Sequence, residues 1–179
     1  MNTIRQMLDN IVPSISPNKN ELSVCHGWVR TLRESSSTLG FCNINDGSNV
    51  NGLQLIISNE NMDDIDIKMF FENVKIGAFI NCIGLIIPSP AKGQDYEFQV
   101  KEFNISTHVD ENYPLCKSKM NIDTLRNHIH FRGRTSTFGS VFRIRSSLTK
   151  ILHDFYHKKG YLHLDPNILR TSFRIVLFL

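Results

Sequence analysis

Residues 38–58 are TLGFCNINDGSNVNGLQLIIS, a stretch with the pattern of two β-strands joined by a turn. The runs 38–44 and 53–58 are apolar, and residues 45–48 (NDGS) between them are a turn signal of the Asp-Gly type. Every second residue of the run 53–58 is apolar, so these residues share one face of their strand. Gln54 alternates out of phase with them, and we expect it on the opposite face.

The surrounding sequence predicts three further strands and one helix. A strand is expected near Gly27, where Val24, His26 and Trp28 alternate, and the spacing of Ile65, Met69 and Phe70 predicts a helix over residues 61–75, before Gly77. Residues 78–87 form a fourth apolar run, and residues 96–106 form a fifth, in which the alternation of Phe98, Val100, Phe103 and Ile105 slips near Lys101. Three strands, a helix and two strands in about 85 residues are the order of an OB-fold, a five-stranded all-β barrel.

OB-fold barrels bind oligonucleotides on the face of strands 2 and 3 and in the loops after strands 1 and 4. Phe41 on the second strand is a candidate for stacking on a base, and Gln54 on the third is a candidate for pairing with a base edge. Arg30 and Arg33 lead into the first loop, and Lys92 lies in the fourth. The alternatives are that Phe41 belongs to the barrel core, that the arginines are solvated edge charges, and that the barrel binds protein or sugar.

The composition is typical of a soluble globular protein, with 41% hydrophobic and 21% charged residues among 179. No stretch approaches the roughly 18 consecutive apolar residues of a membrane span, and the N-terminus lacks the apolar segment of a secretory signal. The four cysteines lie far apart without a C-x-x-C pair: Cys25, Cys42, Cys82 and Cys116. We therefore expect buried free thiols in a reducing compartment rather than a disulfide or a zinc site.

The charge is unevenly divided along the chain. Residues 1–109 carry 8 Lys and Arg against 12 Asp and Glu, whereas residues 110–179 carry 12 against 5. This contrast suggests two units, of which the second is basic enough to attract phosphate. A solvated basic face is the alternative.

The second half predicts a linker and helices. Residues 110–114 (DENYP) are polar and end in proline, and a short helix is expected over residues 121–130. A long helix follows from Phe138 to Lys159, capped by Ser136 or Thr137 and ended by Gly160 as its C′ residue. Its apolar residues are spaced three or four positions apart, as on one side of a helix: Phe138, Val141, Phe142, Leu148, Ile151, Leu152 and Phe155. Residues 161–166 (YLHLDP) predict a strand ended by Pro166.

Several segments in a fixed order carry a family resemblance. They are residues 27–31 (GWVRT), 45–48 (NDGS), 89–94 (SPAKGQ), 113–115 (YPL) and, most telling, 130–146 (HFRGRTSTFGSVFRIRS). Over residues 20–169 the chain resembles the N-terminal part of class II aminoacyl-tRNA synthetases of the aspartate, asparagine and lysine subgroup, and most closely the asparaginyl-tRNA synthetases. An aspartyl or lysyl member of the subgroup is the alternative.

The resemblance implies five segments: an extension (1–20), an OB-fold anticodon-binding domain (21–109), a linker (110–135), the start of an α+β catalytic domain (136–169) and an off-pattern tail (170–179). In the subgroup an aromatic of strand 2 stacks on the middle anticodon base, a uracil, and a glutamine of strand 3 bonds to it, which places Phe41 and Gln54 in those roles. Glu97 matches the acidic residue that helps to read the first anticodon base. The resemblance places Arg30 beside the anticodon, so asparagine tRNA is the implied partner, and neither DNA nor a membrane is expected.

The long helix and the strand after it resemble class II motif 1, which builds the homodimer interface of the family. The resemblance therefore assigns Phe138, Phe142, Arg145 and Pro166 to a dimer interface. Motif 1 binds no ATP, so its apolar positions are expected to serve the interface and the core.

The chain departs from the family pattern near residue 165. Asp165 replaces the usual threonine, residues 166–169 still fit, and residues 170–179 (RTSFRIVLFL) do not resemble what should follow. Motifs 2 and 3, which bind ATP and Mg²⁺ in the parent enzyme, are not recognisable, so neither ATP-dependent aminoacylation nor binding of these cofactors is expected of this chain. A frameshift, a splicing error, an altered transcript end and a genuine short isoform all remain open as explanations.

The leading hypothesis is a fragment of an ATP-dependent asparagine–tRNA ligase that supplies the anticodon reader and the dimer helix. One rival is a non-catalytic module that binds tRNA or single-stranded RNA. Another is a regulatory fragment that pairs with the full enzyme. The cytoplasm is favoured as the compartment, because residues 1–8 lack the arginine and serine of a transit peptide, and an organellar form stays open.

Overall fold

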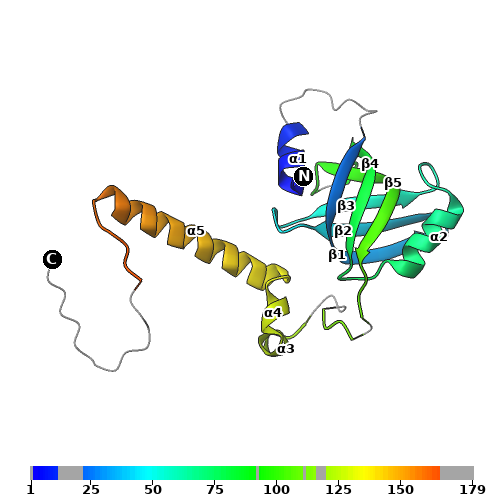
Figure 1. Ribbon diagram of the computed structural model, residues 1–179. Coiled ribbons are helices and arrows are strands. Elements are labelled where there is room, and N and C mark those ends of the chain that lie inside the picture. Colours follow the sequence, from blue (N-terminus) through cyan, green and yellow to red (C-terminus); the bar gives the residue numbers. More distant parts are fainter. Residues whose placement is uncertain (1, 12–21, 92, 111, 116–119, 166–179) are drawn as a thin grey trace. The chain divides into compact units, whose positions relative to one another are not determined.

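Five strands form one sheet that closes on itself (Figure 1): β1 (Ser23–Ser36), β2 (Leu39–Asn45), β3 (Leu53–Ser58), β4 (Phe79–Pro88) and β5 (Tyr96–Thr107). The computed structural model describes residues 2–11, 22–91, 93–110, 112–115 and 120–165. By contacts within the chain it divides into two compact units, Met1–Ser136 and Thr137–Leu179. The closed sheet belongs to the first unit.

The strands follow the order β1-β2-β3-β5-β4, and β4 pairs again with β1. All ladders are antiparallel except the short parallel one between β3 and β5, at Leu55↔Phe98 and Ile56↔Gln99. The helix α2 (Asp64–Asn73) lies between β3 and β4 in the chain. The predicted OB-fold order of three strands, a helix and two strands is thus confirmed, and the five strands close in a ring.

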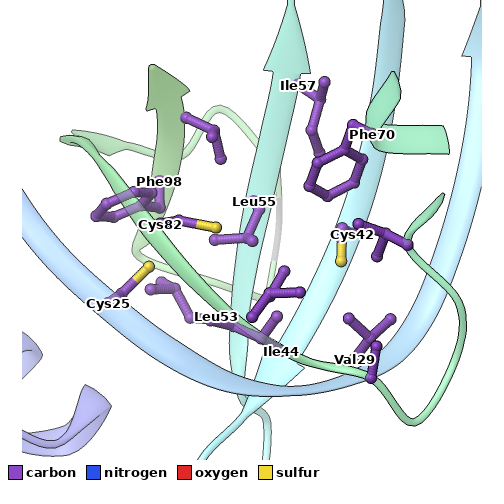
Figure 2. Packing of buried hydrophobic residues seen from close by; sticks show 14 of the residues in the cluster. Cys25, Val29, Cys42, Ile44, Leu53, Leu55, Ile57, Phe70, Cys82 and Phe98 are labelled. Carbon is purple, nitrogen blue, oxygen red and sulfur yellow. The ribbon is translucent and has the colours of Figure 1, made fainter. Parts of the chain in front are cut away.

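The core fills the inside of this ring. Figure 2 shows side chains of β1 to β5 converging on one another, with Phe70 of α2 against the same cluster. Ile67 and Phe70 are the buried residues of α2. The predicted helix is confirmed, but Ile65 and Met69, which were expected on its apolar stripe, are 74% and 48% exposed. A ten-residue helix that closes one sheet buries a narrow stripe, so an apolar residue one step out of phase faces solvent.

Three cysteines lie in this core, as expected. Cys25, Cys42 and Cys82 are free and fully buried, and Cys25 and Cys82 are partners in the β1–β4 ladder. The hydrogen bond with Cys82 and burial raise the pKa of the Cys25 thiol, and burial raises that of Cys42. Cys116 lies outside the described residues.

An N-terminal helix, α1 (Ile4–Ile11), packs on the closed sheet, where the sequence had predicted only an extension. Ile4 and Met7 are buried in the same core cluster. Thr3 and Gln6 form a capping box, in which Gln6 N–H donates to Thr3 Oγ1 (3.2 Å) and Thr3 N–H donates to Gln6 Oε1 (3.0 Å). The Ile4 N–H also donates to Asp46 Oδ2 of the β2–β3 loop, at 2.8 Å.

Two of the irregularities in strand pairing are bulges beside candidate or predicted positions. In β1 the pairing passes from Val29↔Ile44 to Thr31↔Asn43, so Arg30 is an extra residue without a partner on β2. In β5 the pairing passes from Gly84↔Val100 to Ile83↔Glu102, so Lys101 is extra. The slip predicted near Lys101 is confirmed.

After β5 come two short helices, α3 (Ile122–Asn127) and α4 (Ile129–Arg132), where one helix over residues 121–130 was predicted. His128 breaks the helix with φ −107° and ψ 61°. The Asn121 side chain caps α3 by accepting from the Asp123 N–H at 3.3 Å.

The second unit consists, in its described part, of α5 (Ser136–Lys158) from Thr137 onward and the segment after it. The long helix is confirmed, and Gly160 follows it with φ +85°, as expected for a C′ residue. Ser136 is the first residue of the helix rather than its cap. Residues 161–165, predicted to be part of a strand, form none, because in this unit's described part there is no strand to pair with; Pro166 lies outside it. None of the described helices is long and apolar enough to cross a bilayer.

Candidate nucleic-acid interface

The outer face of β2 and β3 carries the two central candidates. Phe41 pairs with Ile56, and Asn43 pairs with Gln54, so these four side chains share one face of the antiparallel ladder. All four are half-buried, whereas Gly40, Cys42, Leu53 and Leu55 between them are buried. The prediction that Gln54 faces away from Leu53 and Leu55 is confirmed. Phe41 lies on this outer face and not in the core.

A cation lies over the Phe41 ring. Arg33 of β1 pairs with Phe41 across the ladder, and its guanidinium carbon is 5.2 Å from the ring centre. This cation–π contact holds the positive charge of the arginine beside the aromatic ring. Arg33 is exposed.

Glu97 of β5 adjoins Gln54. It is only 4% exposed, and the Nε2 of Gln54 donates to its Oε1 at 3.4 Å. Two residues of the β4–β5 loop also donate to Oε1: the Ser89 hydroxyl at 2.7 Å and the Gln94 Nε2. The structure therefore brings Phe41, Gln54, Arg33 and Glu97 together from four neighbouring strands.

Arg30 lies towards the linker. Burial lowers the pKa of its guanidinium; the Tyr113 phenol acts in the opposite direction, and the charge of Arg134 lowers it further. Arg134 packs on Trp28, with its guanidinium carbon 5.1 Å from the indole centre, and Tyr113 packs edge-on against Phe131 at 5.4 Å. These contacts join the linker to the closed sheet beside β1. Lys92, the remaining loop candidate, lies outside the described residues.

The candidates on α5 belong to the second unit. Phe138 and Phe142 lie one turn apart, with ring centres 6.5 Å apart, and Arg145 is exposed. No described residue of α5 is buried. Leu148 and Leu152, on the same apolar stripe, are 54% and 48% exposed. Pro166 lies outside the described residues.

Sequence reasoning missed two residues of this interface, Ser89 and Gln94. Both lie within the SPAKGQ segment that carried the family resemblance, but nothing in that segment alone shows which side chain they contact. The structure shows their contacts with Glu97, which depend on how the β4–β5 loop folds. A hydrogen bond from the Ser89 N–H to the Asp95 carbonyl, at 2.9 Å, closes this loop.

Within the described ranges, no group of three or more His, Cys, Asp and Glu side chains is arranged to hold a metal ion. The chemistry that this face offers is instead a half-buried aromatic, amides, one nearly buried carboxylate and flanking guanidinium groups. These are the groups that stack on bases and pair with their edges.

The strand order and the closed sheet are those of an OB-fold domain. Residues 23–106 match the profile of the tRNA_anti-codon family, described as an OB-fold nucleic acid binding domain. Over a longer span, the chain is 36% identical to the asparagine–tRNA ligase of Borreliella afzelii, across 95% of this chain and 35% of the relative. It is also 36% identical to that of Bacteroides fragilis, across 82% of this chain and 30% of the relative. The chain is thus similar to asparagine–tRNA ligases over most of its own length and spans about a third of theirs.

Solved structures agree on the fold. The asparaginyl-tRNA synthetase of Pyrococcus horikoshii superposes with a TM-score of 0.72 at 17% identity, over 93% of this chain and 39% of that one. The Entamoeba histolytica enzyme, solved in complex with asparaginyl-adenylate, superposes with a TM-score of 0.71 at 16% identity, over 89% of this chain and 37% of that one.

Proposed function

We propose that this chain is the anticodon-reading part of an asparagine–tRNA ligase and binds tRNA on the outer face of β2, β3 and β5. The observation that carries the proposal is the juxtaposition of Phe41, Gln54 and Glu97 on that face of an OB-fold domain. Phe41 offers a ring for stacking, and Gln54 offers an amide for a base edge. Glu97 offers a carboxylate that only accepts hydrogen bonds.

In this proposal the middle anticodon base, uracil, stacks on Phe41 and bonds to Gln54, and Glu97 contacts the first base. Arg33 beside Phe41, Arg30 at the bulge in the middle of β1 and Lys92 in the β4–β5 loop supply positive charge for the anticodon phosphates. The half-burial of Phe41 and Gln54 supports these roles, because each side chain is held by its neighbours while one side stays open to a base.

We further propose that the whole protein joins asparagine to its tRNA with ATP and Mg²⁺. The relatives' activity supports this, since asparagine–tRNA ligases are the homologues over nearly the full chain. ATP and Mg²⁺ are expected to bind regions of the relatives that this chain does not span, and not the residues present here. The cytoplasm is the compartment we propose for it.

The exposed apolar stripe of α5 supports a homodimer. Leu148, Leu152 and Phe155 recur on one side of the helix and are about half exposed, which is costly for a helix left in water. We propose that this stripe, with Phe138, Phe142, Arg145 and Pro166, faces a second subunit. The same surface would let the chain pair with a full-length enzyme as a regulatory partner.

Affinity for an asparagine tRNA transcript tests the anticodon proposal. Phe41→Ala and Gln54→Ala in the full chain should each weaken binding, the former by about 1–3 kcal/mol, the usual worth of one stacked base. Asn104→Ala, an exposed amide towards the other end of β5, is the matched control and should leave the affinity unchanged. Unchanged affinity in both test variants would show that this face does not read the anticodon.

A further inference from the structure

The loop between β2 and β3 contains an exposed asparagine followed by a glycine, Asn51 and Gly52. The side-chain amide of Asn51 makes no hydrogen bond with the residues that the structure describes. Gly52 has φ +75°, and a Cβ added to it would lie 2.3 Å from the Ile44 carbonyl oxygen. Because the conformation is left-handed and the backbone passes so close, only glycine fits at this position. The fold therefore keeps a glycine directly after an exposed asparagine.

An Asn-Gly pair is especially prone to lose ammonia without an enzyme, because asparagine is labile and glycine leaves the following amide nitrogen unshielded. The Gly52 nitrogen gives up its proton and forms a bond to Cγ of Asn51. The Cγ–Nδ2 bond breaks, and ammonia leaves with the proton. Water then opens the resulting cyclic imide at either carbonyl. The products are aspartate and isoaspartate, and the second lengthens the main chain by one carbon.

The reacting nitrogen is engaged in the folded chain. The Gly52 N–H donates to Asn49 Oδ1 at 2.6 Å, and Asn49 Nδ2 donates to the Gly52 carbonyl at 3.2 Å. A nitrogen that donates a hydrogen bond keeps its proton, so attack on Asn51 must first break the bond to Asn49. The fold thus both supplies the reactive pair and restrains it.

The loop holds its other acid-glycine pair, Asp46 and Gly47, in a similar way. The Gly47 N–H donates to Asn45 Oδ1 at 2.7 Å. The Asp46 carboxylate also accepts from the Ser48 N–H at 2.9 Å and from the Ser48 hydroxyl at 2.6 Å. Of the two pairs, only the one at Asn51 therefore has a side chain that is free to react.

The main chain of Asn51 is tied to the outer face of β2 and β3. Its carbonyl accepts from Asn43 Nδ2 at 3.2 Å, and Asn43 pairs with Gln54 on that face. A carboxylate at position 51 would place negative charge near the path proposed for the RNA backbone. An isoaspartate would also displace the carbonyl that holds Asn43. Either product should therefore disfavour RNA on this face.

We propose that Asn51 is a site of spontaneous deamidation, that Asn49 slows the reaction by holding the Gly52 N–H, and that the acidic products weaken RNA binding on the face of β2 and β3. The chemistry at Asn51 stands on the loop alone. The effect on binding rests on the proposed function of that face.

Ageing of the full chain in mildly alkaline buffer tests the chemistry, with Asn51 followed by mass analysis of the tryptic peptide 34–68. The native chain should convert Asn51 more slowly when it is folded than in guanidinium chloride, where the hydrogen bond to Asn49 is lost. Asn49→Ala should speed the reaction in the folded chain roughly fivefold, the worth of one hydrogen bond, and leave the rate in guanidinium chloride unchanged.

Two further variants separate the hydrogen bond from a general loosening of the loop. Asn49→Asp keeps an oxygen that accepts from the Gly52 N–H and should keep the slow native rate. Asn45→Ala removes the corresponding bond at Gly47 and should leave the rate at Asn51 unchanged. Equal acceleration in Asn45→Ala and Asn49→Ala would overturn the role of Asn49. Equal rates in the folded and the denatured native chain would overturn it without any variant.

The variant Asn51→Asp tests the effect on binding, because it carries the charge of the aged chain from the start. It should bind an asparagine tRNA transcript more weakly than the native chain, and the loss should shrink as salt is added. Asn104→Asp is the matched control, since it adds the same charge at an exposed residue towards the other end of β5. Its affinity should equal that of the native chain.

The two assays separate the chemistry at Asn51 from RNA binding. An aged chain in which Asn51 stays intact while other asparagines convert would overturn the site itself. If Asn51→Asp binds as the native chain does while Phe41→Ala binds more weakly, the link from deamidation to binding is wrong and the proposed function stands. If Phe41→Ala and Gln54→Ala both bind as the native chain does, the proposed function falls, and the ageing rates alone decide the chemistry.

Discussion

Gly84 of β4 is a position where a neighbouring strand leaves no room for a side chain. A Cβ added there would lie 1.9 Å from the Gln99 carbonyl oxygen and 2.8 Å from the Phe98 ring. Because the first contact is with backbone, relief requires moving β5 next to its bulge. Gly84→Ala should therefore lower the free energy of unfolding by about 3 kcal/mol in urea titrations.

Gly47 offers the contrast for that measurement. It has φ +90° in the β2–β3 loop with no atom near an added Cβ, so Gly47→Ala should cost only the backbone strain of about 1–2 kcal/mol. Equal losses in the two variants would mean that the β4–β5 contact at Gly84 is looser than described.

The core thiols should be inert while the protein is folded. Burial keeps alkylating reagents out, and the raised pKa of Cys25 and Cys42 leaves little of the reactive thiolate near neutral pH. Iodoacetamide followed by peptide mass analysis should label Cys25, Cys42 and Cys82 only after urea is added. Labelling of these cysteines at equal rates with and without urea would contradict a closed core.

Individual residues were predictable where a strand's alternation decides them. Gln54 faces out because its neighbours Leu53 and Leu55 face in, and that follows from a period of two. The contacts of Ser89 and Gln94 with Glu97 were not predictable, because they depend on the conformation of the β4–β5 loop, which no local pattern specifies. Glu97 itself came from family resemblance and not from any local pattern.

Among the elements, α1 depends on a cap supplied by another part of the chain. Asp46 accepts from the Ile4 N–H, and Ser48 Oγ accepts from the Arg5 N–H at 3.1 Å. Asp46→Ala should thus destabilise the docked helix by about 1 kcal/mol, a typical loss for a helix cap. Asp9→Ala on the exposed side of α1, which removes only a surface ion pair with Arg5, should change stability far less in the same urea titration.

The Asp46 cap should also fail in acid. Burial acts to raise the pKa of this carboxyl, but hydrogen bonds from the Ser48 hydroxyl and from the Ile4 and Ser48 amides outweigh it and hold the pKa below its ordinary value. A lowered folded-state pKa means that the stabilisation is complete above the ordinary carboxyl range, about pH 4, and is lost as the pH falls through the lowered pKa. The difference in the free energy of unfolding between the native chain and Asp46→Ala should be constant between about pH 5 and about pH 7. It should disappear in stronger acid. A gap that widened in acid would be evidence against this cap.

Elements were predictable where their patterns are local. The strand runs and the bulge at Lys101 follow from periodicity, whereas the exposure of Ile65 and Met69 on α2 depends on how the helix sits over the sheet. The docking of α1 was missed because its partner, the Asp46 loop, is some forty residues away. The break at His128 has no proline or glycine to announce it.

At the scale of the whole molecule, α5 predicts self-association. Leu148→Glu would place a charge in the middle of the exposed apolar stripe and should shift the full chain towards monomer in sedimentation equilibrium. Ser146→Glu adds the same charge on another side of the helix and should leave the distribution unchanged. A native chain that stays monomeric at high concentration would argue against the dimer proposed above.

The architecture of the whole was predictable from the order of its elements, since three strands, a helix and two strands admit few closed arrangements. The closure of β4 onto β1 and the parallel contact of β3 with β5 are long-range pairings that no local pattern specifies. They could be expected only because the order of the elements is that of an OB-fold. The same holds for the linker contacts of Trp28 with Arg134.

The bulge at Arg30 makes β1 tolerant of a change in length at one point. Losing a residue inside a regular strand inverts every side chain beyond it, because inside and outside alternate. Arg30 is the supernumerary residue, so its removal would join Val29 to Thr31 without turning Leu32 outward or Arg33 away from Phe41. Single-codon deletions scanned along β1 should therefore abolish folding where the pairing is regular and be tolerated at residue 30, and also at Ser35, where the pairing with β2 has its second irregularity.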